Sequence, residues 1–170
     1  MQPFFFLAIS IARLDFPEAV GPIINLTMKT LEVVYSKEET DNILKYILEK
    51  ARSSFVVFLH GEIGTGKTFL VSELLKAQGV TETITSPTFS IFNEYQAKNF
   101  IVYHYDLYRI KKPEELMFVD IDENLENGML IIEWPRLAKE YGITPDIEIF
   151  LSYTENPNQR KAKIIIYNED

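Results

Sequence analysis

Residues 55–77 read FVVFLHGEIGTGKTFLVSELLKA, and the middle of this stretch matches the phosphate-loop pattern G-x-x-x-x-G-K-[ST]. Residues 55–60 form a short apolar run rich in β-branched and aromatic side chains, which predicts a buried strand. Residues 68–77 place four apolar side chains on one helical face, and Gly79 ends this predicted helix. In this order, backbone N–H groups and the positive helix end face a bound phosphate, so the stretch predicts a nucleotide-binding P-loop.

The residues of the loop have separate expected roles. We expect Lys67 to reach the β- and γ-phosphates and to act in catalysis, and the hydroxyl of Thr68 to bind Mg²⁺. The residues expected to bind the nucleotide are Gly61, Glu62, Ile63, Gly64, Thr65, Gly66, Lys67, Thr68 and Phe69. A glycine-rich turn that merely opens a helix is the alternative, and the strand and helix on either side of the loop disfavour it.

The composition limits the class of protein. The 170 residues are 46% hydrophobic and 25% charged, which suits one domain with a core. The absence of cysteine excludes disulfides, cysteine-ligated zinc and thiol nucleophiles, and indicates a reducing, cytoplasmic location. Two histidines, His60 and His104, are too few for a histidine-rich metal site. The net charge of −8 disfavours a broad basic surface for nucleic acid.

The first 27 residues differ from the rest of the chain. They begin MQPFFFLAISIARL, with no basic residue before an apolar stretch that is too short to span a bilayer. A weak secretory signal is the alternative interpretation, and we expect no association with a membrane. Met28 then opens MKTLEVVYS, which is typical of the start of a domain. We therefore expect residues 1–27 to be an extension whose status stays open, and residues 28–170 to form a single P-loop ATPase domain.

Strands and helices alternate through the predicted domain. Further strands are predicted at residues 31–35, 100–106, 129–134, 146–153 and 161–167. Ser36 and Glu39 predict a capping box before a helix that carries Ile43, Leu44, Ile47 and Leu48 on one side, and Pro113 predicts another helix start. The last two strands predict a hairpin at the sheet edge. The expected fold is α/β: a compact P-loop NTPase with a mixed, mainly parallel sheet flanked by helices.

Two acids follow predicted buried strands. Asp106 ends FIVYHYD and Glu133 ends LIIE, so both are expected at the carboxyl edge of the sheet. Either acid alone could be a helix cap or a solvated residue, but a P-loop favours Mg²⁺ coordination and water activation. The sequence lacks the N-K-x-D segment that would indicate guanine binding. Only three arginines follow the loop, and a small-molecule kinase usually has more. These absences favour an ATPase.

Several segments that follow the loop together carry a resemblance to a known family. They are Thr85-Ser86-Pro87-Thr88-Phe89, Asn93-Glu94-Tyr95, His104-Tyr105-Asp106-Leu107-Tyr108-Arg109, Pro113-Glu114-Glu115-Leu116 and Ile132-Glu133-Trp134-Pro135. In this order and spacing, residues 28–170 resemble TsaE, the ATPase of the bacterial machinery that makes N6-threonylcarbamoyladenosine in tRNA. The resemblance implies a compact ATPase that uses ATP and Mg²⁺, binds the TsaB and TsaD proteins, and meets tRNA only indirectly through that complex.

The resemblance also implies roles for particular residues. The residues expected to bind phosphate and Mg²⁺ are Gly61, Gly64, Gly66, Lys67 and Thr68. Glu133 would also bind Mg²⁺, and Asp106 would act in catalysis. Residues Thr85, Ser86, Pro87, Thr88 and Phe89 would form a switch-like loop or partner loop, with Trp134 in a functional E-W-P segment. A core aromatic is the alternative for Trp134. Phe69 departs from the pattern, because a small hydroxyl residue commonly follows G-K-T, and residues 1–27 are not explained.

Two other functions stay open at the level of sequence. A small-molecule kinase would transfer phosphate to an acceptor, and a nucleotide-sensing module would bind without useful hydrolysis. The sequence has no obvious arginine finger, with Arg109 the nearest candidate, so we expect slow hydrolysis by the isolated protein and stimulation by partners.

Overall fold

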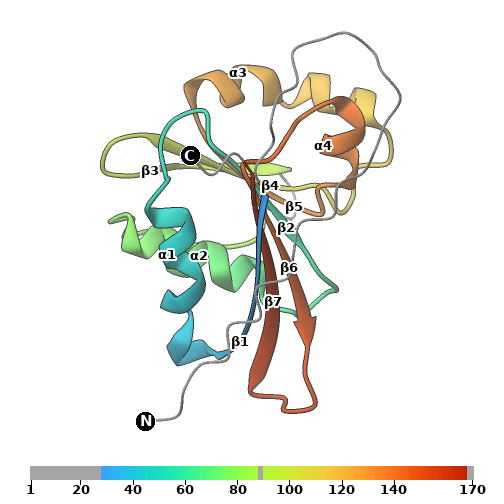
Figure 1. The fold of residues 1–170 in the computed structure, drawn as a ribbon. Coiled ribbons are helices and arrows are strands. Elements are labelled where there is room, and N and C mark those ends of the chain that lie inside the picture. The colour runs from blue at the N-terminus through green and yellow to red at the C-terminus, as the bar shows by residue number, and fades with distance from the viewer. Residues whose placement is uncertain (1–27, 88–89, 168–170) are drawn as a thin grey trace, which may run out of the picture.

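The computed structural model describes residues 28–87 and 90–167, and its ribbon is drawn in Figure 1. Along the chain the elements are β1 (Met28–Ser36), η1 (Lys37–Glu39), α1 (Asp41–Leu48), β2 (Val56–His60), α2 (Lys67–Ala77), β3 (Phe92–Gln96), β4 (Ile101–Asp106), η2 (Pro113–Phe118), α3 (Ile121–Asn127), β5 (Gly128–Glu133), α4 (Arg136–Tyr141), β6 (Ile147–Tyr153) and β7 (Gln159–Tyr167). The expected extension at 1–27 and the loop residues Thr88 and Phe89 lie outside the described residues.

The described strands form one seven-stranded sheet in the order β1-β7-β6-β2-β5-β4-β3. The pairs β6–β2, β2–β5 and β5–β4 are parallel. The pairs β1–β7, β7–β6 and β3–β4 are antiparallel. The predicted mixed α/β sheet is confirmed, but parallel pairs dominate only its centre. The antiparallel pairs at both sides equal the parallel pairs in number among the described strands, so the sheet is mixed without being mainly parallel.

The predicted hairpin at the end of the chain exists but does not lie at the edge of the sheet. β6 and β7 pair in register from Ile147 opposite Ile166 to Tyr153 opposite Arg160. β1 then pairs with the whole outer side of β7, so β1 forms the edge. This arrangement satisfies the backbone groups of β7 that an edge position would leave without partners.

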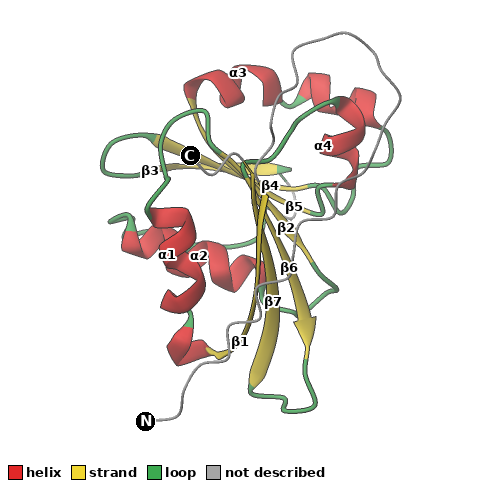
Figure 2. Cartoon of the chain, viewed as in Figure 1, coloured by secondary structure: helices red, strands yellow, loops and turns green. Residues whose placement is uncertain are grey.

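Helices cover both faces of the sheet, as Figures 1 and 2 show, with α1 and α2 on one face and α3 and α4 on the other. Side-chain alternation along β2 explains the two layers. Val57 and Leu59 belong to the apolar cluster under α1 and α2, whereas Val56 and Phe58 belong to the opposite cluster. None of the helices in the described part of the chain has the length and apolar character needed to cross a membrane.

Helix starts differ in detail from the predictions. The backbone N–H of Ser36 donates to Glu39 Oε2 at 2.9 Å, so the predicted capping box is present, but it opens the short 3₁₀ turn η1. The helix itself begins at Asp41, and Ile43, Leu44 and Ile47 are buried as predicted. The segments β3, α3 and α4 were not predicted. They are five to seven residues long, which is too short for a clear hydrophobic period.

Candidate functional site

The predicted phosphate loop joins β2 to α2, and three of its glycines have backbone angles that other residues rarely adopt. The φ values are 144° at Gly61, 81° at Gly64 and 102° at Gly66. A Cβ atom at Gly61 would lie 2.6 Å from the carbonyl oxygen of Leu151, so the loop passes very close to β6. The hydroxyl of Tyr153 donates to the carbonyl of Ile63 at 2.7 Å. The neighbouring strand therefore holds the loop at two points.

Lys67 is buried within the loop and makes three contacts there. Its Nζ donates to the carbonyl oxygens of Gly61 at 2.8 Å and Glu62 at 2.9 Å. The same atom lies 4.0 Å from the centroid of the Trp134 ring. Burial lowers the pKa of the Lys67 ammonium, while the carboxylates of Glu133 and Asp106 act in the opposite direction. The loop thus holds the positive charge of Lys67 where phosphate oxygens could replace the carbonyl groups.

The predicted metal-binding residues are in direct contact. The hydroxyl of Thr68, in the first turn of α2, donates to Glu133 Oε1 at 2.8 Å. Glu133 ends β5 and is only 2% exposed. Asp106 ends the neighbouring parallel strand β4 and is the register partner of Glu133. Parallel pairing therefore brings both predicted acids to the same end of the sheet, beside the phosphate loop.

These oxygen atoms suit Mg²⁺, which prefers hard oxygen ligands. Among the described residues, no group of three or more His, Cys, Asp or Glu side chains could hold a metal ion by itself. Mg²⁺ is usually held by one or two carboxylates together with waters and the phosphates of its nucleotide. Thr68 and Glu133 could provide the protein oxygen atoms of such a ligand set.

His104 on β4 contacts Glu133, a role that its place in the H-x-D-L-Y-R segment did not predict. Its Nε2 lies 2.9 Å from Glu133 Oε1, and the residue is 0% exposed. The alternation of side chains along β4 could have revealed it, because His104 and Asp106 are two residues apart and lie on the same face.

The predicted switch loop contacts the second acid. The hydroxyl of Ser86 donates to Asp106 Oδ2 at 2.6 Å, and the backbone N–H of Tyr108 donates to Asp106 Oδ1 at 3.0 Å. The carbonyl of Thr85 accepts from the side-chain amide of Asn93 at 3.3 Å. The structure therefore brings Ser86 to the site and ties Thr85 to β3, while Thr88 and Phe89 lie outside the described residues.

Trp134 is half-buried and borders the site, so it is not a core aromatic. Its φ of 58° is unusual for a bulky residue, and its backbone N–H donates to the carbonyl of Leu59 at 3.2 Å. The ring packs against Lys67 and also against Tyr108, with centroids 4.9 Å apart. This backbone conformation turns the Trp134 ring toward the loop, directly after Glu133 leaves the sheet.

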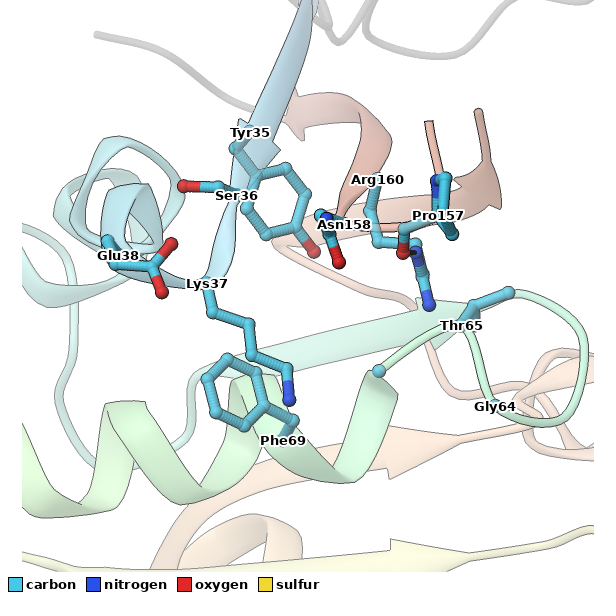
Figure 3. A pocket seen from close by; sticks show the side chains of 11 residues that line it. Tyr35, Ser36, Lys37, Glu38, Gly64, Thr65, Phe69, Pro157, Asn158 and Arg160 are labelled. Atoms are coloured by element: carbon cyan, nitrogen blue, oxygen red, sulfur yellow. Dashed lines mark hydrogen bonds between the residues drawn. The ribbon is translucent and has the colours of Figure 1, made fainter. Parts of the chain in front are cut away.

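Two cavities meet at the loop. The smaller, of about 320 Å³, contains the predicted phosphate and metal residues Lys67, Thr68, Asp106 and Glu133. The larger, of about 650 Å³, lies between the loop, η1 and the β6–β7 turn. Figure 3 shows side chains from these three parts of the chain around it. Its lining residues include Tyr35, Lys37, Phe69, Asn158 and Arg160. Of these five, only Phe69 is a predicted site residue.

Phe69, the departure from the family pattern, lines both cavities. The Lys37 ammonium lies 5.5 Å from the centroid of its ring. Of the other loop residues predicted to bind nucleotide, Thr65 is buried, with its hydroxyl donating to the carbonyl of Glu62 at 2.9 Å. Ile63 is 68% exposed at the tip of the loop. The structure thus brings the predicted loop residues together, with Ile63 directed to solvent.

The fold and the loop, with an acid at the end of the adjacent strand, define a protein of the P-loop NTPase class. The family described as "Threonylcarbamoyl adenosine biosynthesis protein TsaE" matches residues 34–162. The chain belongs to the TsaE family, as the resemblance predicted.

Individual relatives agree with this assignment. A Rickettsia conorii protein named "tRNA threonylcarbamoyladenosine biosynthesis protein TsaE" is 36% identical over 141 residues, covering 82% of this chain and 80% of the relative. A Haemophilus influenzae protein of the same name is 33% identical, covering 77% and 80%. The crystal structure of Bacillus subtilis YdiB matches with a TM-score of 0.65 and 25% identity, over 82% of this chain and 87% of that one.

Proposed function

We propose that this protein is the ATPase subunit of the bacterial machinery that makes N6-threonylcarbamoyladenosine in tRNA. The observation that carries the proposal is the contact of 2.8 Å between Thr68 and Glu133 beside the buried ammonium of Lys67. A phosphate-binding loop and a metal-binding pair are what hydrolysis of a Mg-nucleotide requires. The names of the relatives from Rickettsia conorii and Haemophilus influenzae support the tRNA modification.

The two cavities suggest how ATP is bound. The smaller cavity contains the cation of Lys67 and the two acids, so it suits the phosphates and Mg²⁺. The larger cavity offers aromatic and polar side chains, including Tyr35, Phe69 and Asn158, so it suits the nucleoside. Gly64 and Gly66 line both cavities, so the phosphate loop would lie between the two parts of the nucleotide.

The residues would divide the chemistry among them. Lys67 and the loop N–H groups would bind the phosphates, and Thr68 and Glu133 would hold Mg²⁺, whose positive charge would stabilise the negative charge on the phosphates. Asp106 orients the attacking water or accepts its proton. Asp106 Oδ2 accepts a hydrogen bond from the hydroxyl of Ser86. A movement of residues 85–89 would therefore change how Asp106 is held, which suits a switch loop.

The proposal includes partners and a location. TsaB and TsaD would bind near the loop and stimulate hydrolysis, tRNA would be met only through them, and the site of action would be the cytoplasm. Residues 28–170 would form the single ATPase domain, with 1–27 as an extension. Arg109 has an exposed side chain and is not among the residues that line the smaller cavity. This placement supports slow hydrolysis by the isolated protein, because an arginine finger can raise the rate about 10³- to 10⁵-fold.

Steady-state release of phosphate from ATP, measured while TsaB and TsaD are titrated, tests the proposal. We expect slow release alone, faster release with both partners, and loss of stimulation in Thr88→Ala and Phe89→Ala with ATP binding retained. Transfer of phosphate to an added acceptor would indicate a kinase, and binding without phosphate release under any condition would indicate a sensing module. Full activity that ignores both partners would contradict the proposed switch.

A further inference from the structure

His104 occupies an unusual position for a histidine with no assigned role. It lies on β4, an interior strand next to the edge strand β3, is 0% exposed, and makes one side-chain hydrogen bond, from Nε2 to Glu133 Oε1 at 2.9 Å. Its Nδ1 is the buried side-chain nitrogen or oxygen that has no hydrogen-bond partner among the described residues. Burying a polar atom without a partner costs free energy, so a histidine at this position is unexpected unless its contact with Glu133 has a function.

The contact with Glu133 identifies the ring nitrogen that acts as donor. A carboxylate oxygen accepts hydrogen bonds, so the Nε2–H of His104 donates to Glu133 Oε1. Nδ1 has no hydrogen-bond partner among the described residues, so Nε2 makes the side-chain hydrogen bond of this ring. Oε1 of Glu133 thus accepts two hydrogen bonds, one from His104 and one from Thr68.

The two donors are anchored differently. Thr68 lies in the first turn of α2, directly after the loop that must adapt to phosphate. His104 lies on an interior strand, with β3 on one side and β5 on the other. Its register partners are Asn93 on β3 and Ile131 on β5. Because strand pairing on both sides holds β4, we expect the donor from His104 to keep its position relative to Glu133 when nucleotide binds.

We infer that His104 is a positioning residue that orients the Glu133 carboxylate for Mg²⁺. This inference rests on the proposed Mg-ATP function and adds a residue that acts through Glu133 without touching the nucleotide. Hydrogen bonds to a metal-binding carboxylate fix its rotation, and losing one typically lowers metal affinity about 10- to 100-fold.

The test is the Mg²⁺ dependence of nucleotide binding, measured by calorimetry with a non-hydrolysable ATP analogue in MgCl₂ and in EDTA. In His104→Leu we expect the gain in affinity from Mg²⁺ to fall about 10-fold or more, with the affinity in EDTA unchanged. His104→Gln keeps an N–H donor at a similar reach, and we expect it to restore most of the gain, to within about threefold of the wild type.

A matched control comes from the opposite face of the sheet. Asn124 is also buried, and its side-chain amide donates to the hydroxyl of Tyr105 at 2.6 Å, next to His104 in sequence. Asn124→Leu removes a buried hydrogen bond without contact to Glu133, so the gain from Mg²⁺ should stay at the wild-type value. Thermal unfolding of each variant shows whether a loss of stability accounts for any change.

Three outcomes separate the inference from the function beneath it. A wild-type protein that gains no affinity from Mg²⁺ would overturn the proposed function itself. If the wild type gains affinity and His104→Leu gains as much, His104 does not position Glu133. If Asn124→Leu or His104→Gln loses the gain as fully as His104→Leu, the effect is one of general stability or of ring shape, and the inference is wrong.

Discussion

Asp106 and Glu133 are register partners at the ends of two adjacent parallel strands, yet their carboxylates have different surroundings. Glu133 is 2% exposed and accepts from Thr68 and His104. Asp106 is half-buried and accepts from the hydroxyl of Ser86 and the backbone N–H of Tyr108. One acid is therefore held by Thr68 of the proposed metal site and by His104, and the other by Ser86 of the proposed switch loop and the backbone of Tyr108.

This difference predicts separable effects of the two acids. Glu133→Gln should lower the Mg²⁺-dependent affinity for ATP at least about 10-fold, because it removes the charge that holds the metal. Asp106→Asn should lower phosphate release about 10²-fold or more while ATP affinity stays near the wild-type value. Calorimetry and phosphate release, both measured on both variants, check this. Small and equal effects would mean that neither acid has the proposed role.

The loop residues should control binding without controlling the fold. In Lys67→Ala the phosphates lose a buried cation, and in Thr68→Ala the metal loses a hydroxyl, so productive Mg-ATP binding should disappear in both. Circular dichroism should show an unchanged fold, because these side chains face a cavity. ATP titration of both variants makes the measurement, and unchanged affinity in both would remove the site from this loop.

Trp134 is the single tryptophan of the chain, and it lies against the phosphate loop. Nucleotide binding should draw the Lys67 ammonium toward phosphate and away from the Trp134 ring, so tryptophan emission should change on addition of Mg-ATP. Fluorescence titration tests this, with Trp134→Phe as the variant that lacks the signal and Lys67→Ala as the one that keeps the ring. A full signal in Lys67→Ala would show that the change arises elsewhere.

Gly128 predicts a change in stability that leaves the site unaffected. A Cβ atom there would lie 2.5 Å from the carbonyl oxygen of Ile101 and 2.7 Å from the ring of Tyr103, at the end of β5 away from Glu133. Gly128→Ala should lower the free energy of unfolding by about 1–3 kcal/mol, because the added methyl group overpacks the strand pair. Urea unfolding measures it. ATP affinity should be unchanged, and a variant as stable as the wild type would contradict the predicted clash.

His60 predicts how stability changes with pH. Its Nε2 lies 2.7 Å from Glu148 Oε2, and its ring stacks on Phe150 with centroids 4.1 Å apart. Burial lowers the pKa of His60, while the hydrogen bond and charge of Glu148 act to raise it. The folded protein then binds fewer protons than the unfolded chain as the pH falls below the ordinary histidine value, so the free energy of unfolding decreases there.

The matching measurement is urea unfolding of wild type and His60→Gln between about pH 7 and pH 5. The variant should lose less stability over this range, since its side chain does not titrate. Glu148 makes a separate contribution at lower pH. Burial acts to raise its pKa, but the hydrogen bonds from Tyr167 and His60, together with the charges of Lys139 and His60, outweigh burial and lower it. Parallel curves for the two proteins would show that His60 does not cause the decrease.

Local sequence was enough to predict the phosphate loop between a strand and a helix. The glycines, Lys67 and Thr68 are close together in the chain, and their expected roles follow from backbone geometry within one strand–loop–helix unit. The sequence also predicted that Asp106 and Glu133 lie at strand ends, because each follows the apolar pattern of a buried strand.

Only the tertiary structure decided which residues meet across the sheet. The contacts of Glu133 with His104 and of Asp106 with Ser86 depend on strand order and register, which no local pattern encodes. The larger cavity likewise joins β1, α2 and the β6–β7 turn, which are far apart in the chain. The position of β1 outside the hairpin also depends on the tertiary structure. The outer side of β7 carries backbone groups that need hydrogen-bond partners along its whole length, and only the assembled sheet shows that β1 supplies them.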